Sequence, residues 1–523
     1  MFKLPMNFNQ PRPKQMALIL LFLLIAGGGW AQDPSQSPGS PTDQSTGKTS
    51  GEAVRPPQSG ADTRSSQAGE GAAPSQEPAE TKISPREAQE LFQSVDEILK
   101  FASQQTALPI HKTVKRKLTS RDEVTAYLEK HMAEDEDAQR LKRSESVLKK
   151  FGLLPRDFDL GKFLVALLRE QVAGYYDPKT KTVNLLDWVD VEQQRPVLAH
   201  ELTHALQDQS FGLEKWMKAG TSDLALKRKD ATSEDIDKDE AQTARQAVVE
   251  GQAMAVLIDY ILAPTGQSLT TSPQIVAALK QGMLVGTADS VQFRNAPIFL
   301  KEILTFPYRY GLDFVGEVLV RNGKDKAYSG VFSNPPRSTR QIMEPGTYLS
   351  GEHIEPMHVP ELSRLTKDYE KFDVGSMGEF DVALLVDQYE GVDTSKHVYP
   401  QWRGGYYYAA RPKADPAAPL ALLYVSKWSS PESAAQFAAI YANSLKNRYH
   451  SSREVAFEGH QPQPAAENAQ TVRGGHEWLT EEGDVVIDSE GDTVFISESF
   501  DDATSGRLRE AVMEQHKVAA AAP

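Results

Sequence analysis

Apolar residues recur three and four positions apart through most of the chain between residues 84 and 360. The first predicted helix begins at Ser84, with Pro85 in its first helical position, where the missing N–H is harmless. The same spacing predicts further helices over residues 120–131 and 138–151. Another helix is predicted to be capped by Asp157 or Asp159 and to carry Phe163, Leu164, Leu167 and Leu168. These segments are expected to form the scaffold of a mainly helical domain.

Two β-prone runs interrupt this helical pattern, over residues 172–176 and 182–186. Asp177-Pro-Lys-Thr180 stands between them and is a typical turn sequence, so the two runs are predicted to form a hairpin. A basic stretch over residues 109–118 is a third candidate strand.

Two later helices carry the most informative patterns. The first is predicted to begin with Pro196 and to end at Gly212, and the second is predicted to run from Asp239 to Leu262. In the second helix Arg245, Gln252 and Asp259 recur every seven residues and form one narrow polar edge. Glu250 stands instead on an otherwise apolar face, and a buried carboxylate is costly unless a cation or a metal pairs with it.

The pattern changes near residue 380, after which short strands alternate with two helices. The predicted helices cover residues 429–445 and 501–515, and the predicted strands cover residues 406–408, 420–425, 476–479, 484–487 and 493–500. The fold class expected from the whole pattern is α+β. A mainly helical domain with a small hairpin would occupy residues 83–370, and a C-terminal α+β domain of unknown role would occupy residues 380–518.

The first 82 residues read as an export signal and a linker. Basic residues precede an apolar run over residues 16–26, and Gly29-Trp-Ala31 is a plausible cleavage site, so residues 1–31 are predicted to be a signal peptide. An uncleaved membrane anchor is the alternative, although the run is short for a bilayer span. Residues 32–82 are rich in Ser, Pro and Gly and are predicted to be a disordered linker. The mature protein is therefore expected to be periplasmic or secreted, with no transmembrane span.

Composition narrows the possible chemistry. The chain has 523 residues and a net charge of -15, which argues against nucleic acid as a partner because phosphate binding needs a basic surface. It has no cysteine, so a disulfide framework, a thiol nucleophile and a Cys-ligated metal are all excluded. Any transition-metal site must be built from histidines and carboxylates.

The sequence His200-Glu201-Leu-Thr-His204 supplies such residues within an apolar, helix-forming run. On a helix, His200 and His204 lie on one face and can direct two imidazoles at one point, and Glu201 can reach a water held there. Two imidazoles and a nearby carboxylate suit hydrolytic Zn²⁺ chemistry, with Glu201 as the general base.

A third ligand is needed to complete such a site. The metzincin pattern would require Gly and His where Gln207 and Ser210 stand, so that type is excluded. Glu250, on the apolar face of the later helix, is the favoured third ligand. Glu240 and Asp259 are rival candidates in less apolar surroundings.

His200-Glu201-x-x-His204 together with Glu250-Gly-Gln-Ala253 resembles the gluzincin metallopeptidases. With Gly174-Tyr-Tyr-Asp-Pro before it, the pattern is similar to compact bacterial minimal gluzincins over residues 170–262. The resemblance implies a zincin-like fold, zinc ligands His200, His204 and Glu250, and Glu201 as the base. The chain departs from the thermolysin-like pattern at Met254, where an Asp would support a histidine; Asp208 is a candidate replacement.

These patterns together predict an exported zinc peptidase that cleaves a peptide or protein substrate. The strand with Tyr175 and Tyr176 is expected to pair with an extended substrate. Tyr308 is the favoured donor to the transition state, and the other candidates are Tyr310, His353 and His358. The alternative functions are a non-catalytic envelope binding or assembly protein and a regulatory pseudo-protease that retains a zincin fold.

Overall fold

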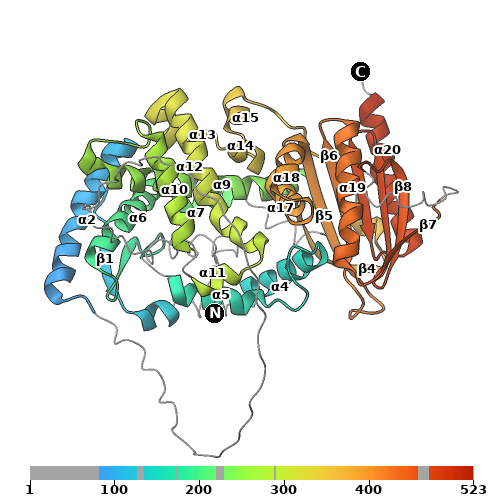
Figure 1. The fold of residues 1–523 in the computed structure, drawn as a ribbon, viewed down its shortest axis with the longest axis horizontal. Coiled ribbons are helices and arrows are strands. Elements are labelled where there is room, and N and C mark those ends of the chain that lie inside the picture. Colours follow the sequence, from blue (N-terminus) through green and yellow to red (C-terminus); the bar gives the residue numbers. More distant parts are fainter. Residues whose placement is uncertain are drawn as a thin grey trace, which may run out of the picture. The chain divides into compact units, whose positions relative to one another are not determined.

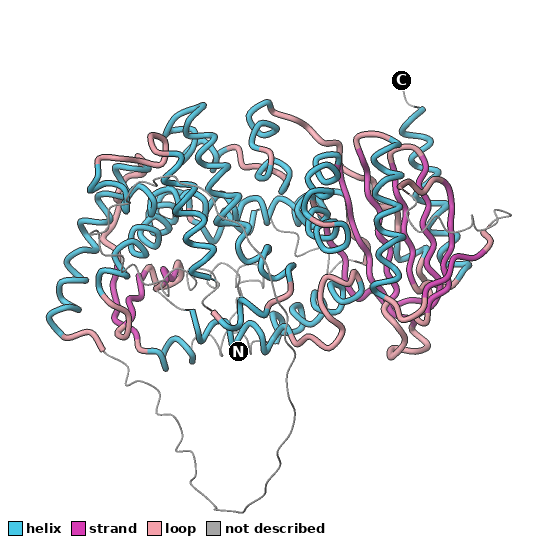
Figure 2. Tube along the Cα trace, viewed as in Figure 1, coloured by secondary structure: helices cyan, strands magenta, loops and turns pink. Residues whose placement is uncertain are grey.

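The computed structural model describes six stretches of the chain: residues 82–126, 135–171, 174–219, 229–287, 290–457 and 470–521. The predicted signal peptide and residues 32–81 of the predicted linker lie outside these stretches. The described residues form many helices and two β-sheets, so the predicted α+β class is confirmed (Figures 1 and 2).

The first described helix, α2 (Pro85–Thr106), begins as predicted. The Ser84 side chain accepts a hydrogen bond from the Glu87 N–H, and the Glu87 carboxylate accepts one from the Ser84 N–H. This reciprocal pair satisfies two backbone donors that a helix start leaves without partners. The helices α4 (Asp135–Lys150) and α5 (Leu160–Gln171) follow.

A small three-stranded sheet comes next. The strands β2 (Tyr175–Asp177) and β3 (Thr182–Leu186) pair antiparallel, which confirms the hairpin within the described residues; residues 172 and 173 lie outside them. The basic segment contributes β1 (Lys115–Thr119), which pairs parallel to β3. β2 is therefore an edge strand of the sheet.

The helix α6 (Val191–Phe211) carries the His-Glu-x-x-His sequence, but the prediction that it begins with Pro196 is wrong. Asp190 caps the helix six residues before the proline by accepting a hydrogen bond from the Glu192 N–H. The buried Gln194 side chain then bonds to the backbone of Leu186 and holds this first turn against β3. Pro196 therefore lies inside the helix. The predicted end at Gly212 is confirmed, since this residue has a φ of 66°.

The helix α9 (Ser233–Leu262) also begins earlier than the predicted Asp239. Thr232 and Asp235 form a reciprocal cap there, equivalent to the one on α2. The segment Ser233–Thr265 is long and apolar enough to span a membrane by length and composition. However, 78% of its most apolar window is buried inside the protein, as befits a core helix.

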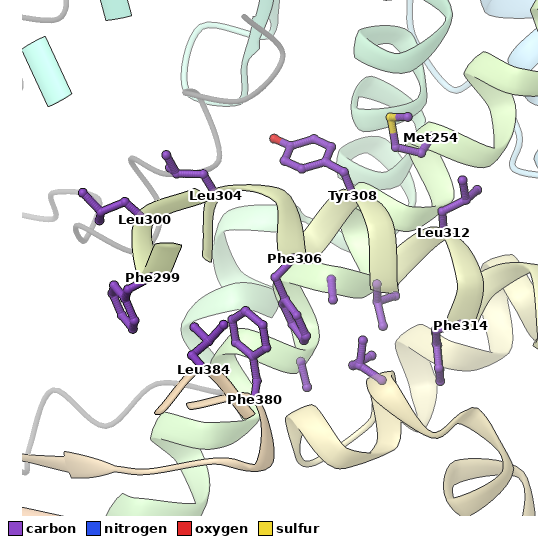
Figure 3. Packing of buried hydrophobic residues seen from close by; sticks show 14 of the residues in the cluster. Met254, Phe299, Leu300, Leu304, Phe306, Tyr308, Leu312, Phe314, Phe380 and Leu384 are labelled. Atoms are coloured by element: carbon purple, nitrogen blue, oxygen red, sulfur yellow. The ribbon is translucent and has the colours of Figure 1, made fainter. Parts of the chain in front are cut away.

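The helix α12 (Ile298–Asp325) packs along α9 at very short range. A Cβ on Gly251 would overlap the backbone carbonyl group of Gly311, and a Cβ on Gly311 would overlap the carbonyl oxygen of Ala247. Only glycine at both positions allows this approach. Figure 3 shows Tyr308 and Met254 on one side of α12, and Phe306 and Phe380 on the other.

Shorter helices surround this core: α7 (Leu213–Ala219), α10 (Pro273–Thr287), α11 (Val291–Asn295), a π-helical turn (Lys326–Gly330), α13 (Val331–Ser333), α14 (Thr339–Met343), α15 (Pro345–Ser350) and α16 (Leu362–Leu365).

The C-terminal part is built on a seven-stranded antiparallel sheet with the strand order β4-β5-β6-β10-β9-β8-β7. Its strands are β4 (Tyr369–Ser376), β5 (Trp402–Pro412), β6 (Ala421–Trp428), β7 (Ser452–Val455), β8 (Gly474–Thr480), β9 (Gly483–Glu490) and β10 (Thr493–Glu498). Its helices are α17 (Glu379–Glu390), α18 (Val392–Val398), α19 (Pro431–Arg448) and α20 (Asp502–Ala521).

This sheet is covered on both faces. Phe437 and Tyr441 of α19 pack on one face, and Leu508 of α20 packs on the other. Tyr406 and Tyr408 belong to β5, which confirms the strand predicted over residues 406–408, and both are buried on the α20 side.

Two buried ion clusters join the helical part to the C-terminal part. Lys150 of α4 pairs with Glu482 at 2.8 Å and approaches Glu498 at 3.7 Å. Arg340 of α14 pairs with Glu379 at 2.8 Å. Breaking one partner of such a buried pair leaves an uncompensated charge and is strongly destabilising. The predicted division into two domains near residues 370–380 stays a prediction.

Candidate metal centre

Three predicted ligands from two helices converge on one point. The Nε2 atoms of His200 and His204 lie 2.8 Å apart. The Glu250 Oε2 atom lies 3.1 Å from the first and 3.4 Å from the second. α6 supplies both imidazoles from one face, as its periodicity requires, and α9 supplies the carboxylate.

The donor set and its spacing fit a zinc ion. Zinc binds nitrogen and oxygen at about 2.0–2.1 Å with tetrahedral geometry, which separates ligand atoms by roughly 3.3 Å. The three observed separations span 2.8 to 3.4 Å. The Nε2 atoms of the two imidazoles lie in contact, and their lone pairs would repel each other. A cation bound to both nitrogens is the simplest way to remove this repulsion.

The three groups are almost completely withdrawn from water. The exposed fractions are 0% for His200, 8% for His204 and 1% for Glu250. Burial lowers the pKa of His200 to about 3. Burial acts the same way on His204, but the Glu250 carboxylate outweighs it and raises the pKa of His204 to about 9.

The Glu250 carboxylate behaves in the complementary way. Burial would raise its pKa, but the charges and hydrogen bonds of His204 and His200 together outweigh burial and lower the pKa of Glu250 to about 2. The Glu250 carboxylate therefore favours a proton on the imidazole of His204. A divalent cation would displace this proton, so metal binding is expected to weaken as the pH falls.

Glu201 is held beside the ligands by the edge strand of the small sheet. Its Oε2 atom accepts a hydrogen bond of 2.6 Å from the Tyr176 backbone N–H. Burial raises the pKa of Glu201 to about 7, against the opposing influence of His204. A carboxylate with a pKa near neutrality is suited to both accept and release a proton.

Asp208 fixes this strand to the helix that carries Glu201. Its carboxylate accepts a hydrogen bond of 2.8 Å from the Tyr176 hydroxyl group and pairs with Lys181 at 2.6 Å. Asp208 therefore contacts the hairpin and neither of the histidines, although it was a candidate support for them. The prediction that Tyr175 and Tyr176 bind substrate stays a prediction, and at Tyr176 the outward N–H is already bonded to Glu201.

Replacing Tyr176 with phenylalanine tests this anchor. The change removes one buried hydrogen bond to a charged group, so we expect the free energy of unfolding to fall by about 1.5–3 kcal/mol. Lys181→Met removes the other partner of Asp208, whose side chain is 57% exposed, and we expect it to cost under about 1 kcal/mol because solvent screens that pair. Chemical denaturation of both variants measures the difference, and equal losses would contradict the anchor.

Tyr308 is the one candidate transition-state donor that the structure brings to the cluster. Its ring stacks on the imidazole of His200 with centroids 6.2 Å apart, and its hydroxyl group interacts with the Glu250 carboxylate. Burial and the neighbouring carboxylates raise the pKa of Tyr308 well above its usual value, so it remains a proton donor. The close contact between α9 and α12 is what carries this side chain to the site.

The other candidates lie elsewhere. Tyr310 packs against Phe306, and His353 is an exposed partner of Glu355. His358 is not part of the cluster of possible metal ligands.

The two rival ligands have partners of their own. Glu240 accepts hydrogen bonds from the backbone N–H and the hydroxyl group of Thr339, at 2.7 and 2.6 Å. Asp259 accepts a hydrogen bond of 2.6 Å from the Leu269 N–H. Both carboxylates lie on α9 but outside the cluster formed by His200, His204 and Glu250.

Two glutamines at the site were not predicted. The Nδ1 atom of His204 lies 2.9 Å from the Gln207 Oε1 atom, and the Gln207 Nε2 atom donates to the Gln252 Oε1 atom at 2.9 Å. Both glutamines are fully buried. The signal was present in the seven-residue spacing that placed Gln252 on a polar edge of its helix, but that pattern does not say what the edge contacts.

Comparison of the chain with protein-family models, with curated proteins and with solved structures finds no match in any of the three.

Proposed function

We propose that this protein is an exported zinc-dependent peptidase of the gluzincin type, with a zincin-like catalytic part. The observation that carries the proposal is the convergence of His200, His204 and Glu250 on one point, with Glu201 buried next to them. A site that only held a metal for structural reasons would not need a second carboxylate with a pKa near 7.

The proposed roles follow from the positions of the side chains. A zinc ion held by His200, His204 and Glu250 would polarise the scissile carbonyl group and acidify the attacking water. Glu201 takes the proton of that water and later delivers it to the leaving amine. Tyr308, protonated beside Glu250, is placed to donate to the negative charge that develops on the carbonyl oxygen.

The test is metal analysis combined with cleavage of a peptide library by the wild type and by Glu201→Gln. We expect both proteins to bind one zinc ion per chain, because Glu201 is not a ligand. We expect the rate of cleavage by the variant to fall by about 10²–10⁴-fold, the usual contribution of a general base. A wild type that binds no zinc, or a variant that cleaves as fast as the wild type, would refute the proposal.

One observation favours a second candidate, a binding or assembly protein in which the metal only stabilises the fold. The ligands are at most 8% exposed, and a cavity of about 740 Å³ between α10 and α12 is lined by none of them. The same experiment separates the two functions. The second candidate predicts zinc binding, a lower temperature of unfolding after chelation, and no cleavage of any library peptide.

A further inference from the structure

We propose that Gln207 and Gln252 are positioning residues that fix His204 as a zinc ligand; the inference rests on the proposed function. Their side-chain amides form a relay that starts at the imidazole of His204 and ends at backbone carbonyl groups beyond α12. Neither amide reaches the point on which the three ligands converge, so both act through His204.

The relay is continuous and buried at every step. The Gln207 Nε2 atom donates to the Gln252 Oε1 atom at 2.9 Å and to the Val249 carbonyl oxygen at 3.0 Å. The Gln252 Nε2 atom donates to the carbonyl oxygens of Ala327 and Tyr328, at 2.7 and 3.2 Å. The last two residues belong to the π-helical turn Lys326–Gly330, whose wider turn changes the usual pattern of helical hydrogen bonds.

The backbone carbonyl groups at the far end dictate the direction of every hydrogen bond. A carbonyl oxygen can only accept, so Gln252 must present its NH₂ group to Ala327 and Tyr328 and its oxygen to Gln207. Gln207 must then donate to Gln252, which leaves its own oxygen facing the Nδ1 atom of His204. That oxygen also can only accept, so Nδ1 must carry the hydrogen.

The position of this hydrogen determines the state of the other ring nitrogen of His204, Nε2, which faces the metal ligands. A neutral imidazole with its hydrogen on Nδ1 has its lone pair on Nε2. The Nε2 atom of His204 is the one that lies 3.4 Å from Glu250 and 2.8 Å from the Nε2 atom of His200. The relay therefore selects the tautomer that can bind a metal at this point.

The relay also supplies what the chain lacks at Met254. That position holds a buried thioether, which cannot orient an imidazole as a carboxylate would. Gln252 stands two residues after Glu250 on α9, so the same helix supplies one metal ligand and supports another on α6.

Folding alone does not require this pair of amides. Replacing two buried hydrogen-bonding partners with apolar groups of similar shape can be nearly neutral for stability. A polar relay in apolar surroundings is therefore explained better by the imidazole at its end than by packing.

The test measures zinc affinity on metal-depleted full-length protein, by competition with a chromophoric chelator, with the absorption spectrum of the Co²⁺ form as a second readout. We expect Gln207→Leu to weaken zinc binding by about 10–100-fold, as supporting residues of metal ligands usually do. Gln252→Leu should weaken it by roughly 10-fold, since only the Val249 carbonyl oxygen then holds the Gln207 NH₂ group away from His204. The double variant should be no weaker than Gln207→Leu, because Gln252 acts only through Gln207.

Two further variants serve as the control and the rescue. Gln194→Leu removes an equally buried amide from the same helix, bonded to Leu186 and Val189 away from the cluster, and should leave zinc affinity within about twofold. Gln207→Glu keeps an oxygen that accepts from Nδ1 of His204. Its carboxyl group would be buried against the carbonyl oxygens of Gln252 and Val249, which favours the protonated form, and the O–H then replaces the donor of the glutamine amide. The variant should therefore retain the affinity that Gln207→Leu loses.

Each outcome decides the inference. If the wild type binds zinc but Gln252→Leu binds it equally well, or if the losses in the double variant add, the relay is refuted while the proposed function stands. If the wild type binds no zinc, both are refuted. If the leucine variants do not fold, Gln207→Glu decides alone, and a loss of affinity of more than about tenfold would overturn the relay.

Discussion

Replacing Glu250 with glutamine is expected to weaken zinc binding by at least about 10³-fold, so that the variant is isolated without stoichiometric zinc. Zinc sites contribute roughly 10–16 kcal/mol of binding free energy across their ligands, so losing one charged ligand removes several kcal/mol. Glu250 also supplies the only negative charge among the three converging atoms. Metal analysis and chelator competition measure the change.

Glu240→Gln is the matched control. It makes the same change from carboxylate to amide on the same helix, and Glu240 is also buried, at 7% exposed. Glu240 accepts hydrogen bonds from the N–H and the hydroxyl group of Thr339, and the amide oxygen of glutamine can still accept both. We expect this variant to bind one zinc ion. If Glu240→Gln loses the metal and Glu250→Gln keeps it, the ligand set described here is wrong.

The sequence was sufficient for the parts of the site that depend on local geometry. His200 and His204 are four residues apart, and the helix alone places them on one face. Glu250 could be singled out because a carboxylate on an apolar helix face is costly, even though its partners are about fifty residues away. The hairpin was predictable from its turn sequence.

The sequence was not sufficient where the contacting residues lie on different elements. The relay from His204 to Ala327 depends on how α6, α9 and the π-helical turn cross, and no local pattern encodes that crossing. The order of the C-terminal sheet is missed for the same reason, since β6 pairs with β10 rather than with the next strand in the chain.

The starts of α6 and α9 were predicted too late in the chain for a different reason. Pro196 resembled a start because proline suits a first helical turn, yet Asp190 offers a side-chain cap that proline does not. In α9, the Thr232 cap likewise extends the helix beyond the predicted start at Asp239. In both cases a capping side chain several residues earlier sets the start of the helix.

Gly311→Ala is expected to be among the most damaging single-methyl changes in the chain. The added methyl group would overlap the carbonyl oxygen of Ala247, and the Cβ would stand 3.2 Å from the Cα atom of Gly251. The obstacles are backbone atoms of α9, so no side-chain rotation can relieve them and the two helices must separate. Overpacking costs about 1–3 kcal/mol where side chains can adjust, and we expect at least about 3 kcal/mol here.

The matched control lies on the same helix. A Cβ on Gly316 meets no atom within 4 Å, so Gly316→Ala should raise the free energy of unfolding by up to about 1 kcal/mol, because alanine favours the helix over glycine. Chemical denaturation of both variants tests the difference in sign.

Gly311→Ala should also affect activity, because α12 carries Tyr308 to the metal ligands. The separation of the helices should withdraw the Tyr308 ring from His200 and the Tyr308 hydroxyl group from Glu250. Peptidase activity should therefore fall even at temperatures where the variant remains folded, while Gly316→Ala keeps wild-type activity. If Gly311→Ala were as stable and active as Gly316→Ala, the close contact between α9 and α12 would not be what places Tyr308.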